Sequence, residues 1–373
     1  MQNRVVMLVD LDYFFAQCEE RRNPSIKDKP VVVCVYSGRS EDSGAVSTAN
    51  YIARKYGVKS GISIFLAKRK LKDQDAVFLP LNRDFYEQIS DEIMEILRSH
   101  ADLFEQVGID EAYLDVSQKV KGSFEEAEEL AKKIKGEVKT EQELTCSIGV
   151  GPNKLIAKIA SSVQKPDGLT VVKPEQVESF LSQLPVNRLI GVGRKTTEKM
   201  RDLGISTVGD LAKYDVRKLN EVFGENLGTY FHNASVGTDD EPVQERGEAG
   251  SISRISTLKK DTKDLETILE KVNPLCDDVH ERLTQRGLNF KTVGIVAVMT
   301  DLSIHSRSRT FETPTNKLDA FKETARELFE KFLEDSELEV RRVGVKVSNL
   351  VEQETQKQIT DFVGAQSSPS SMA

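Results

Sequence analysis

The stretch VGIDEAYLDVS, residues 107–117, has the apolar and aromatic residues of a β-strand, yet it carries two adjacent acids, Asp110 and Glu111. A buried carboxylate is costly unless it is paired, hydrogen-bonded or bound to a metal ion. Neighbouring side chains of a strand also point to opposite faces. Two interpretations are open: an acidic turn at a wet strand end, or a cation site. For a cation site, we expect Asp110 to lie at a turn, so that both acids can converge.

A third acid comes from the N-terminal stretch RVVMLVDLDYFFAQCEE, residues 4–20. The apolar run 5–9 suits a strand that is buried on both faces. Asp10 and Asp12 follow at its end, where a helix beginning near Tyr13 needs an N-cap. Hard carboxylate oxygens suit Mg²⁺, and strand ends commonly carry catalytic groups. The sequence therefore predicts a divalent-cation site formed by acids from two strand ends.

The composition limits the class of protein. The 373 residues are enough for roughly two to four domains. Because the formal net charge is −8, any phosphate-binding surface must come from segregated charge. The four cysteines have neither disulfide nor zinc spacing, and we expect reduced thiols. Without an apolar stretch of about 18 residues or a secretion signal, we expect a cytoplasmic protein that does not enter a membrane.

The order of strand and helix patterns predicts an α+β chain of several domains. Residues 1 to about 175 follow the βαββαβ order of a split βαβ sheet, with an insertion between Asp12 and about residue 78. Residues 176–233 form short helical patterns broken by glycine, and 234–249 have the polar composition of a linker. Residues 250–350 repeat the βαββαβ order, and the polar end is expected to be disordered.

One segment of the helical region suggests backbone binding to nucleic acid. The stretch RLIGVGRKTTEKMRDLGI, residues 188–205, resembles a helix-hairpin-helix, in which glycines expose backbone amides at a helix N-terminus to a phosphate. Gly191 and Gly193 fit that role, and Lys195 adds positive charge. The alternative is a plain helical connector.

Basic residues on two expected strands of the last domain also suit phosphate oxygens. Arg307 and Arg309 share one face of the strand in SIHSRSRTF, residues 303–311. Arg342 and Lys346 share one face of the strand in VRRVGVKV, residues 340–347. Such strand-borne cations bind phosphate well, although an ordinary solvated sheet face is the alternative.

Three further residues could hold a triphosphate. In TANYIARKYGV, residues 48–58, Tyr51 and Arg54 fall on one helix face. Lys165, in QKPDG, is a second candidate cation. Taken singly, each has the character of a surface residue.

Five motifs together resemble the Y family of translesion DNA polymerases, in the DNA polymerase IV branch and most like its archaeal members. They are VDLDYFFAQCEE, SGAVSTANYIARKYGVKSGI, IDEAYLDVS, SIGVGPNKLIAKIAS and QKPDGL, in this order. The resemblance implies a right-hand polymerase with a βαββαβ palm, small fingers, a helical thumb and a second βαββαβ little-finger domain. The implied bounds are palm 1–10 and 79–167, fingers 11–78, thumb 168–233, linker 234–249, little finger 250–350 and tail 351–373.

The resemblance also implies residue roles. Asp10, Asp110 and Glu111 match the catalytic, metal-binding carboxylates, and the carbonyl of Leu11 is a further ligand. Phe15 matches the steric gate against a ribose 2′-hydroxyl, although Phe14 and Phe15 could be core aromatics. The residues that match the site of the incoming triphosphate are Thr48, Tyr51, Arg54 and Lys165. Small residues at Gly44, Ala45 and Ser47 are consistent with a roomy pocket roof.

The implied activity is template-directed DNA synthesis with two Mg²⁺ ions, for which Mn²⁺ can substitute. The implied partners are primer-template DNA and deoxynucleoside triphosphates. We expect a monomer that copies DNA with low fidelity and has no proofreading activity. In the tail, Gln356, Ile359 and Phe362 fit the peptide by which polymerases bind a sliding clamp, although Val363 departs from its pattern. A nucleotidyl cyclase and a non-catalytic DNA-binding scaffold are the rival interpretations.

Overall fold

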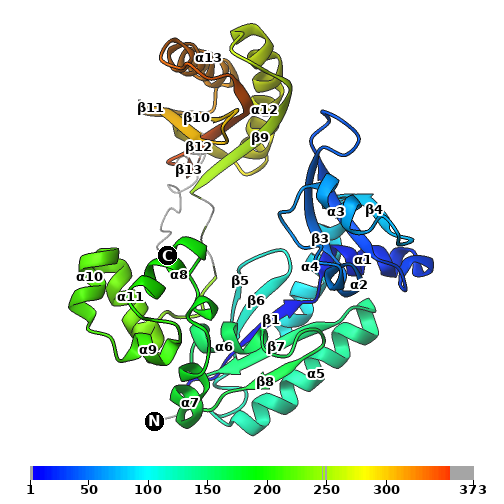
Figure 1. Ribbon diagram of the computed structural model, residues 1–373, viewed down its shortest axis with the longest axis vertical. Coiled ribbons are helices and arrows are strands. Elements are labelled where there is room, and N and C mark those ends of the chain that lie inside the picture. The colour runs from blue at the N-terminus through cyan, green and yellow to red at the C-terminus, as the bar shows by residue number, and fades with distance from the viewer. Residues whose placement is uncertain (1–2, 246, 248–249, 353–373) are drawn as a thin grey trace, which may run out of the picture. The chain divides into compact units, whose positions relative to one another are not determined.

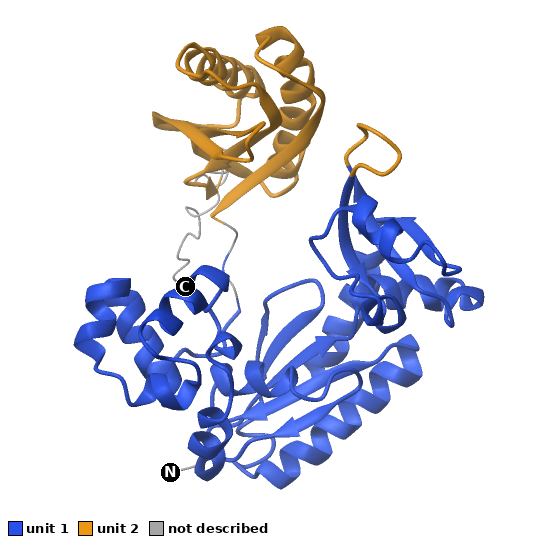
Figure 2. Ribbon diagram, in the orientation of Figure 1, with its two compact units in different colours: residues 1–36, 44–247 blue, residues 37–43, 248–373 orange. Residues whose placement is uncertain are grey.

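The computed structural model describes residues 3–245, 247 and 250–352. The chain divides into two compact units, residues 1–36 with 44–247, and residues 37–43 with 248–373 (Figure 2). The prediction of an α+β chain with two βαββαβ units is confirmed by the order of the elements. Among the helices of the described ranges, none is long and apolar enough to cross a bilayer.

The first unit is built on a five-stranded sheet with the order β5-β6-β1-β7-β8 (Figure 1). Its first strand, β1, lies in the centre because both of its faces are apolar: Met7 and Val9 belong to one core, and Val6 and Leu8 to another. Helices α4 and α5 contribute to the first core, and α6 packs against β1 and β7. The bounds are β1 Val6–Leu11, α4 Arg83–Ser99, β5 Leu103–Gln106, β6 Glu111–Asp115, α5 Phe124–Gln142, β7 Cys146–Gly151, α6 Lys154–Ser161 and β8 Leu169–Val171.

The predicted insertion carries its own three-stranded sheet, with the order β3-β2-β4. Strand β4 pairs in parallel with β2, from Val31 beside Val77 to Cys34 beside Pro80. The boundary predicted between residues 78 and 79 therefore cuts a strand, and the insertion extends through Pro80. Its elements are α1 Phe14–Arg22, η1 Pro24–Ile26, β2 Val31–Tyr36, β3 Gly44–Ala49, α2 Tyr51–Lys55, α3 Ile64–Lys70 and β4 Val77–Pro80.

Short helices follow the sheet, as the glycine-broken pattern predicts. They surround a core that includes Leu181, Met200, Leu211 and Phe231. Polar caps begin several of them; Thr207 and Asp210, for example, form a capping box. The elements are η2 Pro174–Gln176, α7 Val177–Ser182, η3 Val186–Arg188, α8 Arg194–Asp202, α9 Val208–Ala212, α10 Val216–Phe223 and α11 Glu225–Ser235.

The segment predicted as a linker, residues 234–249, is partly packed against the sheet of the first unit. Val243 is buried in one cluster with Val6 and Leu8 of β1. The ammonium group of Lys154 joins the buried Glu105 at 2.8 Å to Glu241 at 2.9 Å. Its polar composition indicated a linker, and the segment is attached to the first unit by the apolar side chain of Val243, by Lys154 and by further contacts that include the pairing of Glu245 with Arg98.

The second unit has the same element order and a different strand order, β11-β10-β12-β9. Strands β10 and β12 are central, whereas in the first unit the first strand is central. Helices α12 and α13 pack on one face through buried side chains that include Val279, Phe321 and Phe329. The bounds are β9 Ser251–Thr262, α12 Leu265–Gln285, β10 Leu288–Met299, β11 Ile304–Thr315, α13 Leu318–Glu334, β12 Val340–Ser348 and β13 Val351–Glu352.

Candidate active site

The three predicted acids meet at one end of the β1–β6 pair. Asp10 lies opposite Glu111 in the antiparallel register, and Glu111 is the first residue of β6. Asp110 lies in the bend just before that strand, and its carbonyl oxygen accepts the backbone N–H of Leu11 at 2.8 Å. The prediction that Asp110 lies at a turn is confirmed. Because Asp110 lies in a bend and Glu111 begins the strand, these adjacent acids need not point to opposite faces of a sheet and can serve one site.

A cavity of about 240 Å³ opens beside these acids. The predicted metal-binding and nucleotide-binding residues line this cavity, except Glu111, which follows the lining residue Asp110 in the chain. Ser47 also lines it, whereas Gly44 and Ala45 do not. A Cβ atom on Gly44 would lie 2.2 Å from the carbonyl oxygen of Val35, so strand pairing accounts for that glycine. The lining residues are Asp10, Leu11, Tyr13, Phe14, Phe15, Ser47, Thr48, Tyr51, Arg54, Ser60, Asp110 and Lys165.

Two lysines form ion pairs with the carboxylates of Asp10 and Glu111. The ammonium group of Lys165 contacts Asp10, and that of Lys158, from α6, contacts Glu111 and lies 3.7 Å from Asp10. In the part of the chain that the structure describes, no three acidic, histidine or cysteine side chains are placed to hold a metal ion as they stand. Sequence reasoning missed Lys158, although the quoted motif SIGVGPNKLIAKIAS contains it.

Asp110 differs from its two neighbours because no lysine contacts its carboxylate in the described residues. Burial raises the pKa of this carboxyl group, and the negative charges of Asp10 and Glu111 raise it further. Crowded carboxylates of this kind are stabilised by a bound cation. Their oxygens are hard ligands, which fit a divalent ion such as Mg²⁺ better than a soft metal.

Asp12 has a role that the sequence did not reveal. Tyr13, not Asp12, is the residue before α1, and it makes no side-chain cap. The fully buried carboxylate of Asp12 instead accepts hydrogen bonds from Ser147 Oγ at 2.7 Å and Thr145 Oγ1 at 2.9 Å. It also accepts the backbone N–H of Asp167 at 2.8 Å. Asp12 thus attaches the loop that carries Lys165 to the sheet.

The aromatic residues of the cavity support one another. The ring of Phe15 stacks on the buried Tyr86, whose hydroxyl donates to Glu19 at 2.7 Å. The guanidinium of Arg54 lies over the ring of Tyr51, 4.7 Å from its centroid, and donates to the carbonyl of Ala49. Tyr51 and Arg54 therefore present one joint face to the cavity, as their helical spacing predicts.

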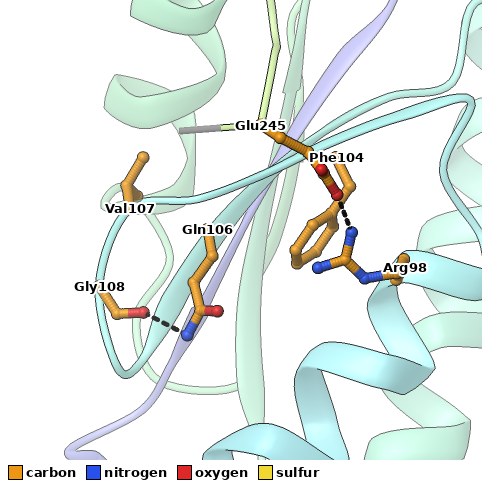
Figure 3. A pocket seen from close by; sticks show the side chains of 6 residues that line it. All are labelled: Arg98, Phe104, Gln106, Val107, Gly108 and Glu245. Atoms are coloured by element: carbon orange, nitrogen blue, oxygen red, sulfur yellow. Dashed lines mark hydrogen bonds and ion pairs between the residues drawn. The ribbon is translucent and has the colours of Figure 1, made fainter. Parts of the chain in front are cut away.

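A larger cavity, of about 460 Å³, lies beside the β5–β6 turn (Figure 3). Arg98 pairs there with Glu245 and lies over the ring of Phe104, and Gln106 donates to the carbonyl of Gly108 at 3.1 Å. Its one lining acid already has a cationic partner. The smaller cavity is therefore the better candidate for catalysis, because two acids, Asp10 and Asp110, line it together with the cations Arg54 and Lys165.

The predicted phosphate-binding residues of the helical region lie at the start of α8. Gly191 has a φ of +82°, a conformation that favours glycine, and Gly193 is the N-cap of the helix. Lys195 follows in its exposed first turn. The N–H of Gly193 is donated to the carbonyl of Gly191 at 3.2 Å, so a phosphate at this turn would be bound by amides of the first turn of α8.

The basic residues of the second unit lie on opposite faces of its sheet. Arg307 lies opposite the buried Ile295 in the register, so its side chain points to the helix-covered side of the sheet. On that side Arg309 pairs with Glu327 of α13, and Arg307 pairs with Asp335, the C-cap of the same helix. Lys346 lies opposite Gly294, and Arg342 shares its face, which the helices leave open. The predicted clamp-binding residues Gln356, Ile359 and Phe362 lie outside the described residues.

Comparisons with known proteins agree with this arrangement. The impB/mucB/samB family model matches residues 9–162, the model of its C-terminal domain matches 249–360, and the thumb domain of DNA polymerase-iota matches 187–239. DNA polymerase IV of Nitrosopumilus maritimus is 48% identical, over 97% of this chain and 100% of that protein.

Solved structures give the same result. A Y-family DNA polymerase chimera of Dbh and Dpo4 has a TM-score of 0.88 and 38% identity, covering 93% of this chain and 99% of that one. An insertion ternary complex of Dbh DNA polymerase has a TM-score of 0.68 and 37% identity over the same shares.

The fold, the acidic strand-end site and these relatives together define a template-directed nucleotidyltransferase. The chain belongs to the Y family of DNA polymerases, in its DNA polymerase IV branch. It is accordingly a DNA-directed DNA polymerase of the translesion class, which uses divalent metal ions, primer-template DNA and nucleotides.

Proposed function

We propose that this polymerase adds deoxynucleotides to a primer 3′ end by two-metal-ion phosphoryl transfer, with low fidelity and without proofreading, and that it copies damaged template bases. The observation that carries the proposal is the convergence of Asp10, Asp110 and the triphosphate-binding candidates on one cavity. The proposed bounds are palm 1–10 and 81–167, fingers 11–80, thumb 168–233 and little finger 250–350, with residues 234–249 connecting the last two.

Asp10, Asp110, Glu111 and the carbonyl of Leu11 would hold the metal ions, for which we propose Mg²⁺. Two such ions lower the pKa of an attacking hydroxyl and stabilise the leaving group of an in-line displacement. The residues of this chain would orient the reactants. Two hydroxyls and two cations line one side of the cavity, so Thr48, Tyr51, Arg54 and Lys165 would bind the triphosphate. The edge of Phe15 would exclude a ribose 2′-hydroxyl.

DNA would be bound through its backbone by two surfaces. One is the start of α8, with Gly191, Gly193 and Lys195. The other is the open face of the second sheet, with Arg342 and Lys346. Arg307 and Arg309 remain secondary candidates, since both are engaged in ion pairs. Such contacts bind phosphate without reading sequence.

We also propose a monomeric, cytoplasmic enzyme that a sliding clamp recruits through Gln356, Ile359 and Phe362. With valine at residue 363, we expect the affinity to be on the order of micromolar. Deletion of residues 356–373 should leave extension of a short oligonucleotide unchanged and remove clamp stimulation on a primed circle.

The test of the central proposal is primer extension with Mg²⁺. Asp110→Ala and Glu111→Ala should each abolish incorporation and leave primer-template binding largely intact, because phosphate contacts elsewhere supply most of the affinity. Near-normal extension by both variants would rule out the acids.

A further inference from the structure

The side chain of Lys158 stands where a divalent ion would bind. Its ammonium group contacts Glu111 and lies 3.7 Å from an oxygen of Asp10, so it bridges acids from β6 and β1. The triphosphate-binding candidates include Lys165 but leave Lys158 without a function. Lys158 does not line the cavity beside the acids. Its described partners are the proposed metal ligands themselves.

The charge of the cluster requires such a partner. Asp10, Asp110 and Glu111 carry three negative charges when ionised, and their side chains lie partly buried at one strand mouth. Like charges this close destabilise the folded protein. Two ammonium groups on Asp10 and Glu111 reduce this repulsion while no metal ion is bound.

A metal ion and Lys158 exclude one another at these oxygens. A divalent ion that binds both Asp10 and Glu111 would repel an ammonium group on the same atoms. The backbone of α6 is fixed, because Ile156 and Ala157 are fully buried and Asn153 caps the helix. The side chain of Lys158 is long and 31% exposed, so it can turn to solvent without moving the helix.

We propose that Lys158 is an internal counter-ion that occupies the metal site of the metal-free enzyme and leaves it when the metal binds. It keeps the carboxylates together before catalysis and lowers the apparent affinity for the metal ion. Lys158 acts through the acids and is a positioning residue. The inference rests on the proposed metal site at Asp10, Asp110 and Glu111.

Mn²⁺ binding to the full chain, without DNA or nucleotide, tests the exchange directly. Free Mn²⁺ is counted by electron paramagnetic resonance. Lys158→Gln removes the competing charge and should bind Mn²⁺ at least threefold more tightly than the wild type. Lys158→Arg keeps a cation in place and should bind Mn²⁺ no more tightly. Lys132→Gln is the matched control, because Lys132 also pairs with two acids, Glu128 and Glu129 on the exposed side of α5, and its loss should leave the affinity unchanged.

Thermal unfolding gives a second measurement. With EDTA, Lys158→Gln should unfold at a lower temperature than the wild type, since the acids then repel one another more strongly. Added Mn²⁺ should raise its unfolding temperature by more than it raises that of the wild type. Lys132→Gln should show the same response to Mn²⁺ as the wild type.

The outcomes separate this inference from the proposed metal site. If Asp110→Asn and Glu111→Gln both leave Mn²⁺ binding unchanged, the metal binds elsewhere and the proposed site fails. If those variants lose Mn²⁺ while Lys158→Gln binds it with wild-type or weaker affinity, the metal site stands and the exchange is wrong. Tighter binding by Lys158→Arg would also overturn the exchange.

Discussion

The ring of Phe15 lies against the ring of Tyr86, with 4.6 Å between the centroids and 18° between the planes. Tyr86 is fully buried on α4, and its hydroxyl is fixed by Glu19. The residue proposed to select the sugar is therefore held by a second ring outside the cavity. Stacked pairs of this kind contribute about 0.5–1.5 kcal/mol beyond the area they bury.

Tyr86→Leu should relax the selection of deoxynucleotides over ribonucleotides, because Phe15 then loses the surface that fixes its ring. The measurement is the ratio of kcat/KM values for the two nucleotides. Tyr86→Phe is the control, since it keeps the ring and removes only the hydroxyl. Phe15→Ala should relax the selection most. Equal selectivity in the Leu variant and the wild type would mean that Phe15 is fixed by other contacts.

Asp110→Asn should stabilise the metal-free protein at neutral pH while abolishing extension. Burial and the charges of Asp10 and Glu111 raise the pKa of Asp110, so the folded protein binds this proton more tightly than the unfolded chain does. The stability it contributes is therefore present at acid pH and is lost as the pH rises through the folded pKa. Asparagine carries no charge at any pH.

In EDTA, the unfolding temperature of Asp110→Asn should exceed that of the wild type at about pH 8, and the difference should shrink towards about pH 5. Asp301→Asn is the control on an exposed turn, where hydrogen bonds from Ser303 lower the pKa of Asp301. It should give no gain at either pH. A gain for Asp110→Asn that grows as the pH falls would contradict the assignment.

Asp12→Ala should destabilise the fold and weaken nucleotide binding together. The substitution leaves the buried hydroxyl of Ser147 and the N–H of Asp167 without their acceptor, while Thr145 keeps Gln17, at a cost of about 2–4 kcal/mol. The loop that carries Lys165 also loses its attachment, so the KM for the nucleotide should rise more than kcat falls. Denaturant unfolding and steady-state kinetics measure the two effects. A stable variant with an unchanged KM would contradict this role.

The sequence predicts the site well where spacing along one element decides the geometry. Tyr51 and Arg54 are three residues apart on α2, and Asp110 and Glu111 lie where a bend passes into β6, so local rules place them. The relation of Lys158 to Glu111 depends on how α6 packs against β1 and β7 and on the pairing of β1 with β6, which no local pattern contains. The same holds for Asp12, whose partners Thr145 and Ser147 are far away in the sequence.

The sheet of the second unit shows a further limit. Period-two alternation indicates that Arg307 and Arg309 share a face and that Arg342 and Lys346 share a face. It does not indicate whether the two faces are the same, because that depends on the register with β10. The register places Arg307 with Ile295 on the helix-covered side and Lys346 with Gly294 on the other.

This difference leads to a prediction about DNA binding. Arg342→Ala with Lys346→Ala should reduce the slope of log affinity against log salt by about two units, since each lost phosphate contact removes roughly 0.9. Arg307→Ala with Arg309→Ala is the matched pair with the same change of charge. It should reduce the slope by less, because Asp335 and Glu327 already neutralise these side chains. The measurement is a salt titration of primer-template binding by fluorescence anisotropy. A larger loss of slope in the Arg307 and Arg309 variant would place the DNA against β11 and not on the open face of the sheet.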